Sequence, residues 1–145
     1  MRIVIDTNIV FSSILNSNSK ISKIILHPRN KLHFYSTDQL LKEIEEHKSK
    51  IKTLSHYSDT DLERIITLIT NKIRFINVRL ISREAFIFAE SLTKDVDIDD
   101  TEFVALTEHL KGKLWSGDLS LQRGLKNKGW KKFITTTELT ELLGK

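Results

Sequence analysis

The sequence predicts an α/β fold in which helices cover both faces of a parallel sheet. Short apolar runs alternate with amphipathic segments along the 145 residues, and this order favours parallel strands joined by helices. Hydrophobic residues make up 39% and charged residues 29% of the chain, a balance typical of a globular protein with one core. Five glycines and one proline leave little material for linkers, so we expect one domain spanning residues 1–145.

Five short segments have the composition of strands. Residues 2–6 read Arg-Ile-Val-Ile-Asp, an apolar run that ends in an acid and is typical of a buried parallel strand. The other expected strands cover residues 32–35, 74–78, 113–115 and 133–135. Because Trp115 lies inside one of these strands, we expect it to belong to the core.

Hydroxyl side chains mark the starts of the expected helices. Ser36 and Gln39 fit a capping box, in which each side chain satisfies a free backbone amide of the other residue. The helix that follows has Leu40 and Ile44 facing inward and can reach Ile51. Hydroxyl residues that can cap other helices are Ser19, Ser58, Ser82 and Thr135.

The composition excludes several classes of protein. The absence of cysteine rules out disulfides, thiolate zinc sites and cysteine nucleophiles, and it is consistent with a cytoplasmic protein. No apolar run approaches the roughly 18 residues of a membrane span, and Asp6 and Asn8 interrupt any signal-peptide core. We therefore expect no membrane partner. The net charge of +4 permits a polyanionic partner without requiring one.

Four acids lie at positions from which they can meet at one edge of the sheet. Asp6 and Asp118 each follow a short apolar strand, and ligands of an open parallel sheet bind beyond the carboxyl ends of its strands. Asp100 stands at an expected helix start, and Glu43 lies on the helix after the second strand. Since helix starts face the same edge, we expect all four carboxylates to share one pocket.

Carboxylates brought together in this way need a counter-charge. Two unit charges at about 4 Å repel by roughly 4 kcal/mol at an effective dielectric near 20, and a bound cation relieves that repulsion. Oxygen ligands without thiolates suit Mg²⁺ or Mn²⁺. Such an ion can activate a water for hydrolysis of a phosphodiester bond. The sequence therefore predicts a metal-dependent hydrolytic site.

Each acid also has a purely structural explanation. Asp6, Asp100 and Asp118 can cap the helices that follow them, and Glu43 shares its helix with other acids that form a solvated face. Other catalytic arrangements find no support: the serines lack a convincing base, and the glycines never take the spacing of a phosphate-binding loop.

Four blocks of sequence resemble the PIN domain family. Residues 3–8, IVIDTN, are similar to its opening strand and acid-Thr-Asn signature, and residues 40–44, LLKEI, to the block with its second acid. Residues 97–106, DIDDTEFVAL, resemble the third block, and residues 115–118, WSGD, resemble the fourth, in which Ser or Thr precedes an acid by two positions. The blocks occur in the family's order over nearly the whole chain.

The resemblance implies a three-layer α/β/α sandwich with a central parallel sheet and Mg²⁺- or Mn²⁺-dependent cleavage of single-stranded RNA. It assigns metal binding and catalysis to Asp6 and Asp100, with Glu43 and Asp118 completing the acidic site. Neighbouring acids leave two alternatives open, because Glu45 or Glu46 could replace Glu43, and Asp97 or Asp99 could act as an accessory acid. Hydroxyl and amide side chains that would support the site are Thr7, Asn8 and Ser116.

The resemblance also carries expectations about partners. Many small bacterial members of the family are toxins of toxin–antitoxin pairs, so it implies an antitoxin protein as a partner and a homodimer as an assembly. A non-catalytic module of the same fold that binds RNA or protein is one alternative. A nuclease that cuts single-stranded or flap DNA with the same acids is another.

A basic strip follows the fourth block. Residues 119–137 contain no acid, and such a strip can follow a phosphate backbone while an aromatic ring stacks on a base. The candidate nucleic-acid contacts are Arg123, Lys126, Lys128, Trp130, Lys131 and Lys132. The alternative is an ordinary solvated surface with Trp130 half-buried.

Overall fold

The computed structural model describes residues 1–28 and 31–144. Within them, five parallel strands form one sheet in the order β3-β2-β1-β4-β5. The strands are β1 (Arg2–Ile5), β2 (His33–Thr37), β3 (Ile73–Ile76), β4 (Lys113–Trp115) and β5 (Phe133–Ile134). The predicted α/β class with a central parallel sheet is therefore confirmed, and most strand boundaries differ from the prediction by one or two residues.

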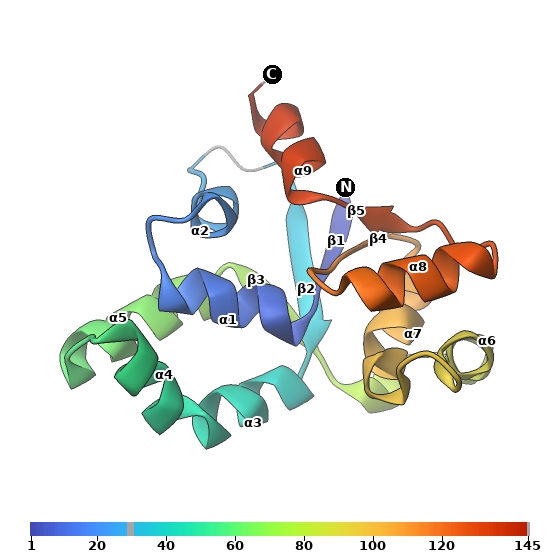
Figure 1. Ribbon diagram of the computed structural model, residues 1–145, viewed down its shortest axis with the longest axis horizontal. Coiled ribbons are helices and arrows are strands. Elements are labelled where there is room, and N and C mark those ends of the chain that lie inside the picture. Colours follow the sequence, from blue (N-terminus) through green and yellow to red (C-terminus); the bar gives the residue numbers. More distant parts are fainter. Residues whose placement is uncertain (29–30, 145) are drawn as a thin grey trace.

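Helices cover both faces of the sheet (Figure 1). One face packs against α1 (Thr7–Leu15), α2 (Lys20–Ile25), α3 (Gln39–Glu46), α4 (Lys48–Ser55), α5 (Asp59–Thr70) and α9 (Thr136–Leu143). The other packs against α6 (Arg83–Thr93), α7 (Thr101–Leu110) and α8 (Leu119–Asn127). Two short 3₁₀ turns, η1 (Val78–Leu80) and η2 (Ile98–Asp100), precede α6 and α7.

The central strand β1 divides the core in two. Ile3 and Ile5 belong to the apolar cluster on the α1 side, and Val4 between them belongs to the cluster on the α7 side. This alternation follows from the two-residue period of a strand, and full burial of all three side chains explains the continuous apolar run of the sequence. Trp115 is fully buried, which confirms its place in the core.

The predicted capping box at Ser36 is wrong. Ser36 and Thr37 continue β2, and the Ser36 hydroxyl donates a 2.8 Å hydrogen bond to the Ile5 carbonyl on the neighbouring strand. The helix starts after Asp38, whose side chain makes no capping bond, and it stops at His47 before α4 begins. The capping positions predicted for Ser19, Ser58, Ser82 and Thr135 are confirmed.

None of the helices formed by the described residues has the length and apolar character needed to span a membrane.

Candidate active site

The site lies where the strand order of the sheet reverses. β1 is followed along the chain by β2 on one side, while β4 pairs with it on the other. Asp6 directly follows β1, and the segment from Ser116 to Asp118 directly follows β4. Ligands of open α/β sheets usually bind at such switch points, and the topology places two of the predicted acids at this one.

Asp6 is a buried acid held by backbone amides. Its side chain is 3% exposed, and its Oδ1 accepts a 3.0 Å hydrogen bond from the Ile9 amide. Burial raises the pKa of Asp6, while hydrogen bonds from the Ser116 hydroxyl and from the amides of Ile9 and Asn8 oppose that rise. The Asp118 charge adds to the rise in pKa, so these two carboxylates interact across the strands.

Asp118 caps the start of α8, as Asp6 caps the start of α1. Its Oδ1 accepts a 3.0 Å hydrogen bond from the Leu121 amide, and its own amide donates a 3.1 Å hydrogen bond to Ser116 Oγ. Capping of a helix and membership of the acidic site are therefore compatible, because a cap uses one carboxylate oxygen and leaves the other available. The predicted supporting residue Ser116 touches both acids.

The closest acidic group combines Asp97, Asp100 and Asp118. Each offers one carboxylate oxygen, and the three oxygens lie within 4.8 Å of one another. The pKa of Asp100 is raised to about 7, mainly by burial, with further contributions from Asp97, Asp6 and Asp118. Asp6 thus belongs electrostatically to the same site. Acids from two distant parts of the chain, Asp6 and the segment 97–118, therefore interact at the sheet edge.

Packing against α8 holds the loop that carries Asp97. A Cβ atom on Gly124 would lie 2.6 Å from Val96 Cγ1, so the missing side chain lets the loop approach the helix closely. Lys128 donates a 2.8 Å hydrogen bond to the Leu92 carbonyl and is ion-paired with Asp95. The segment immediately before Asp97 is therefore held against α8 and the residue that follows it, Lys128.

Glu43 lies in a second acidic group next to the first. Its charge and that of Asp38 both raise the pKa of Glu102, although burial is the largest cause. Glu102 stands in the first turn of α7 and accepts a 2.6 Å hydrogen bond from the Thr37 hydroxyl. Glu43 is half-buried and lies outside the three-oxygen group. Glu102 was not among the predicted site residues, because its partner Thr37 lies 65 positions earlier in the chain.

The donor set fits a hard divalent cation. The three carboxylates offer oxygen atoms only, and two of them are held by hydrogen bonds to backbone amides at Leu121 and Asp99. Burial raises the pKa of Asp100, and repulsion from Asp97, Asp6 and Asp118 raises it further. A bound cation would remove that repulsion, and oxygen-only ligands suit Mg²⁺ or Mn²⁺.

A family model for the PIN domain matches residues 4–141. The chain belongs to the PIN-domain family. PIN domains are generally nucleases that use divalent metals, and this member carries the acidic cluster that such chemistry needs. No curated protein matches the chain at a significant level.

The PIN domain holds the other predicted supporting residues next to Asp6. Thr7 and Asn8 open α1, and the Asn8 amide hydrogen-bonds to the Asp6 carboxylate. Asn8 therefore supports the acid through its backbone, while its exposed side chain lines a groove on the surface.

Trp130, a predicted nucleic-acid contact, is buried in the structure. Its ring is 4% exposed, and its indole N–H donates a 2.7 Å hydrogen bond to Glu108 Oε1. The same Glu108 oxygen lies 2.9 Å from Lys132 Nζ. Lys128 is ion-paired with Asp95, as described above, so carboxylates of the protein partly offset the charges of Lys128 and Lys132. Arg123, Lys126 and Lys131 are exposed and have no ion pair with another described residue.

Proposed function

We propose that this PIN domain is a Mg²⁺- or Mn²⁺-dependent endoribonuclease that cleaves single-stranded RNA. The observation that carries the proposal is the meeting of the Asp97, Asp100 and Asp118 oxygens within 4.8 Å of one another. The family resemblance favours RNA as the substrate, and the exposed basic residues of α8 supply positive charge for its backbone.

The chain's own residues have separate tasks in this proposal. Asp97, Asp100 and Asp118 would hold the cation, and Asp6 adds negative charge from a position fixed by backbone amides. When bound, the cation supplies activation of the attacking water and offsets charge on the phosphate oxygens. Ser116 orients Asp6 and Asp118 through its hydroxyl. Asp100 must lose its proton before it can act as a ligand.

Single-stranded substrate is consistent with the shape of the site. The acids lie at the sheet edge between the helix starts of α1, α7 and α8. Because Asp97, Asp100 and Asp118 are only partly exposed, a substrate backbone has to bend toward them to bring a phosphate close. A flexible single strand bends inward more easily than a stiff duplex.

The test is cleavage of labelled RNA and DNA oligonucleotides, single-stranded and duplex, with Mg²⁺, Mn²⁺ or EDTA. We expect cutting of single-stranded RNA that EDTA abolishes. Asp100→Asn should remove activity, and the matched control is Asp99→Asn, because Asp99 is exposed in the same turn and lies outside the three-oxygen group.

The outcomes separate the proposal from its alternatives. Attack by water leaves no cyclic phosphate on the product, whereas a contaminating ribonuclease that uses the ribose hydroxyl forms one. Cutting of DNA in place of RNA would make this protein a DNA nuclease. Binding of RNA without cutting under every metal would make it a binding module, and either result would overturn the proposal.

A further inference from the structure

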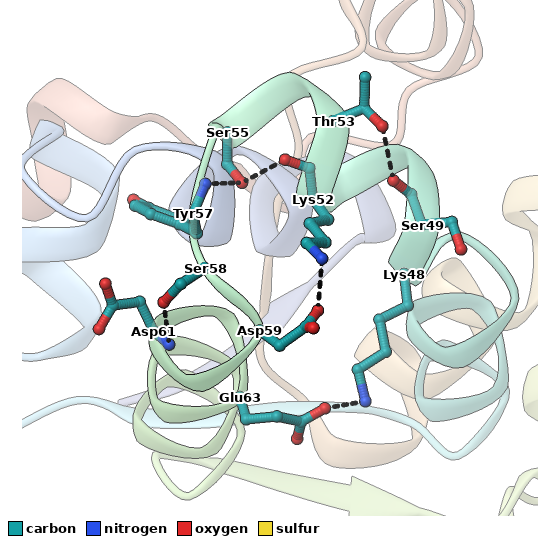
Figure 2. Close-up of polar contacts among 10 residues, drawn as sticks. All are labelled: Lys48, Ser49, Lys52, Thr53, Ser55, Tyr57, Ser58, Asp59, Asp61 and Glu63. Atoms are coloured by element: carbon teal, nitrogen blue, oxygen red, sulfur yellow. Dashed lines mark hydrogen bonds and ion pairs between the residues drawn. The ribbon is translucent and has the colours of Figure 1, made fainter.

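Two of the lysines of α4 are used to fasten this helix to α5. Lys48 is ion-paired with Glu63, and Lys52 Nζ lies 2.7 Å from Asp59 Oδ1 (Figure 2). Both lysines extend from α4 toward α5 in that view, as expected for residues one helical turn apart. Lys50 lies between them in sequence and therefore about 160° away around the helix.

The opposite side of α4 forms one wall of a groove, and α1 forms the other. The groove has a volume of about 420 Å³, which falls within the roughly 300–1,000 Å³ of small-ligand sites. Its lining includes Asn8, Phe11 and Leu15 from α1, and His47, Lys50 and Leu54 from the region of α4. Leu54 is 58% exposed, so apolar surface remains open in the groove.

Asn8 is shared between the groove and the surroundings of Asp6. The Asn8 amide hydrogen-bonds to the Asp6 carboxylate, while Asn8 also lines the groove. A nucleotide chain that runs from the acids past Asn8 would enter the space between α1 and α4.

We propose that this groove is a nucleotide subsite, which takes the base of a nucleotide next to the scissile phosphate while Lys50 contacts the phosphate backbone. The inference rests on the proposed function, because it assumes a single-stranded nucleic acid at the acids. It makes Lys50 and His47 positioning residues, whose effect is on binding of the substrate.

The groove offers an aromatic ring for a base and a positive charge for a phosphate. The rings of Phe11 and His47 meet edge to face, with centroids 5.9 Å apart and planes at 75°, and the exposed His47 ring offers a face for a base. Stacking of this kind tolerates any base. Lys50 is exposed and has no ion pair with another described residue, so its charge remains available for a phosphate.

The experiment measures binding of a fluorescein-labelled single-stranded RNA by anisotropy, in an Asp100→Asn background that prevents cleavage. Lys50→Ala should weaken binding, and the slope of log K against log salt should fall by about 0.7, the value for one phosphate contact on a single strand. His47→Ala should weaken binding about fivefold or more with an unchanged slope. Lys42→Ala is the matched control, since Lys42 is an exposed lysine of α3 that does not line the groove.

Failure of the subsite and failure of the proposed function give different results. If Lys50→Ala and His47→Ala both match Lys42→Ala, the subsite is wrong, even where the wild-type protein cuts RNA. If the wild-type protein cuts nothing but both variants lose binding as expected, the subsite stands and the nuclease proposal fails. In an active wild-type background, Lys50→Ala should raise KM severalfold with little change in kcat, because it lies outside the acidic site.

Discussion

The Thr37 hydroxyl at the end of β2 donates a 2.6 Å hydrogen bond to Oε1 of Glu102 in the first turn of α7. This contact joins the strand that precedes Glu43 to the helix that follows Asp100. Thr37 is fully buried, so its hydroxyl faces the carboxylate from within the protein. Burial raises the pKa of Glu102, the hydrogen bond from Thr37 lowers it, and the charges of Glu43 and Asp38 add to the rise.

Replacing Thr37 by valine should destabilise the protein in a pH-dependent way. The free energy of unfolding should fall by about 1 kcal/mol at pH values where Glu102 is ionised, since the carboxylate then lacks its donor. Because the hydrogen bond lowers the pKa of Glu102, its contribution is present at high pH and disappears as the carboxylate takes up a proton. Urea unfolding at several pH values measures this effect.

Thr37→Ser provides the control for that measurement. It keeps the hydroxyl and removes a buried methyl group, so its destabilisation should not depend on pH. Equal pH profiles for the two variants would show that the hydrogen bond contributes nothing to stability.

Asp100→Asn should make the metal-free protein more stable at neutral and alkaline pH. Burial and neighbouring acids raise the pKa of Asp100 from 3.8 to about 7. This acid therefore costs the wild-type protein no stability below pH 3.8, and the free energy of unfolding decreases as the pH rises from there through about 7. A pKa rise of this size corresponds to at most about 4 kcal/mol in the free energy of unfolding. Because Asp100 is partly exposed, solvent screening reduces the gain in stability expected for Asp100→Asn to about 1–2 kcal/mol.

Thermal melts in EDTA across this pH range test the prediction. The difference between variant and wild type should be near zero at about pH 4 and reach its maximum at about pH 8. A variant that is less stable than wild type at the alkaline end would contradict the charge repulsion argued for this site.

Addition of Mg²⁺ should stabilise the wild-type protein and affect Asp100→Asn much less. At a hundredfold excess over the dissociation constant, the wild type should gain about 2.7 kcal/mol. Below about pH 7 the apparent affinity should fall by up to tenfold per pH unit, because the Asp100 proton competes with the cation. Asp99→Asn should respond like the wild type, and an equal response of Asp100→Asn would remove Asp100 from the ligands.

The parts of the fold with a clear local signal could be predicted from the sequence. The β1 run of residues 3–5 and the capping boundaries at Ser58 and Thr135 were correct, because burial on both faces and side-chain capping leave direct patterns in sequence. Ser36 shows where such reasoning fails. Its neighbours fit a capping box, yet its hydroxyl donates to Ile5 across the sheet, a contact that depends on a strand partner far away in the sequence.

In the acidic site, too, residues with a local signal could be predicted and residues that depend on a distant partner could not. Asp6, Asp100 and Asp118 could be placed at one edge from topology alone, since each lies at a strand end or helix start. The companion acid Glu102 could not be distinguished from a solvated acid, because its partner Thr37 lies 65 positions away in the chain. The burial of Trp130 depends in the same way on Glu108 of a different helix.

Trp130→Phe should lower stability without affecting nucleic-acid binding. The substitution removes the indole donor to Glu108, and we expect a loss of about 1–2 kcal/mol. Because the ring is buried, the affinity of the folded variant for single-stranded RNA should stay within twofold of wild type. Arg123→Ala is the comparison, since this exposed residue of α8 should weaken RNA binding without loss of stability. A large loss of affinity in folded Trp130→Phe would restore the stacking role.

Gly124→Ala should reduce cleavage although Gly124 contacts no acid of the site. The added Cβ would lie 2.6 Å from Val96 Cγ1, so the loop must move away from α8 and take Asp97 with it. Small displacements of a positioned group can reduce rates by about a hundredfold. The Mg²⁺ dissociation constant, measured by calorimetry, should rise in parallel, while Val96→Ala in the same variant should restore space and part of the affinity. A Gly124→Ala protein with wild-type Mg²⁺ affinity would show that the packing of Val96 does not position the ligand.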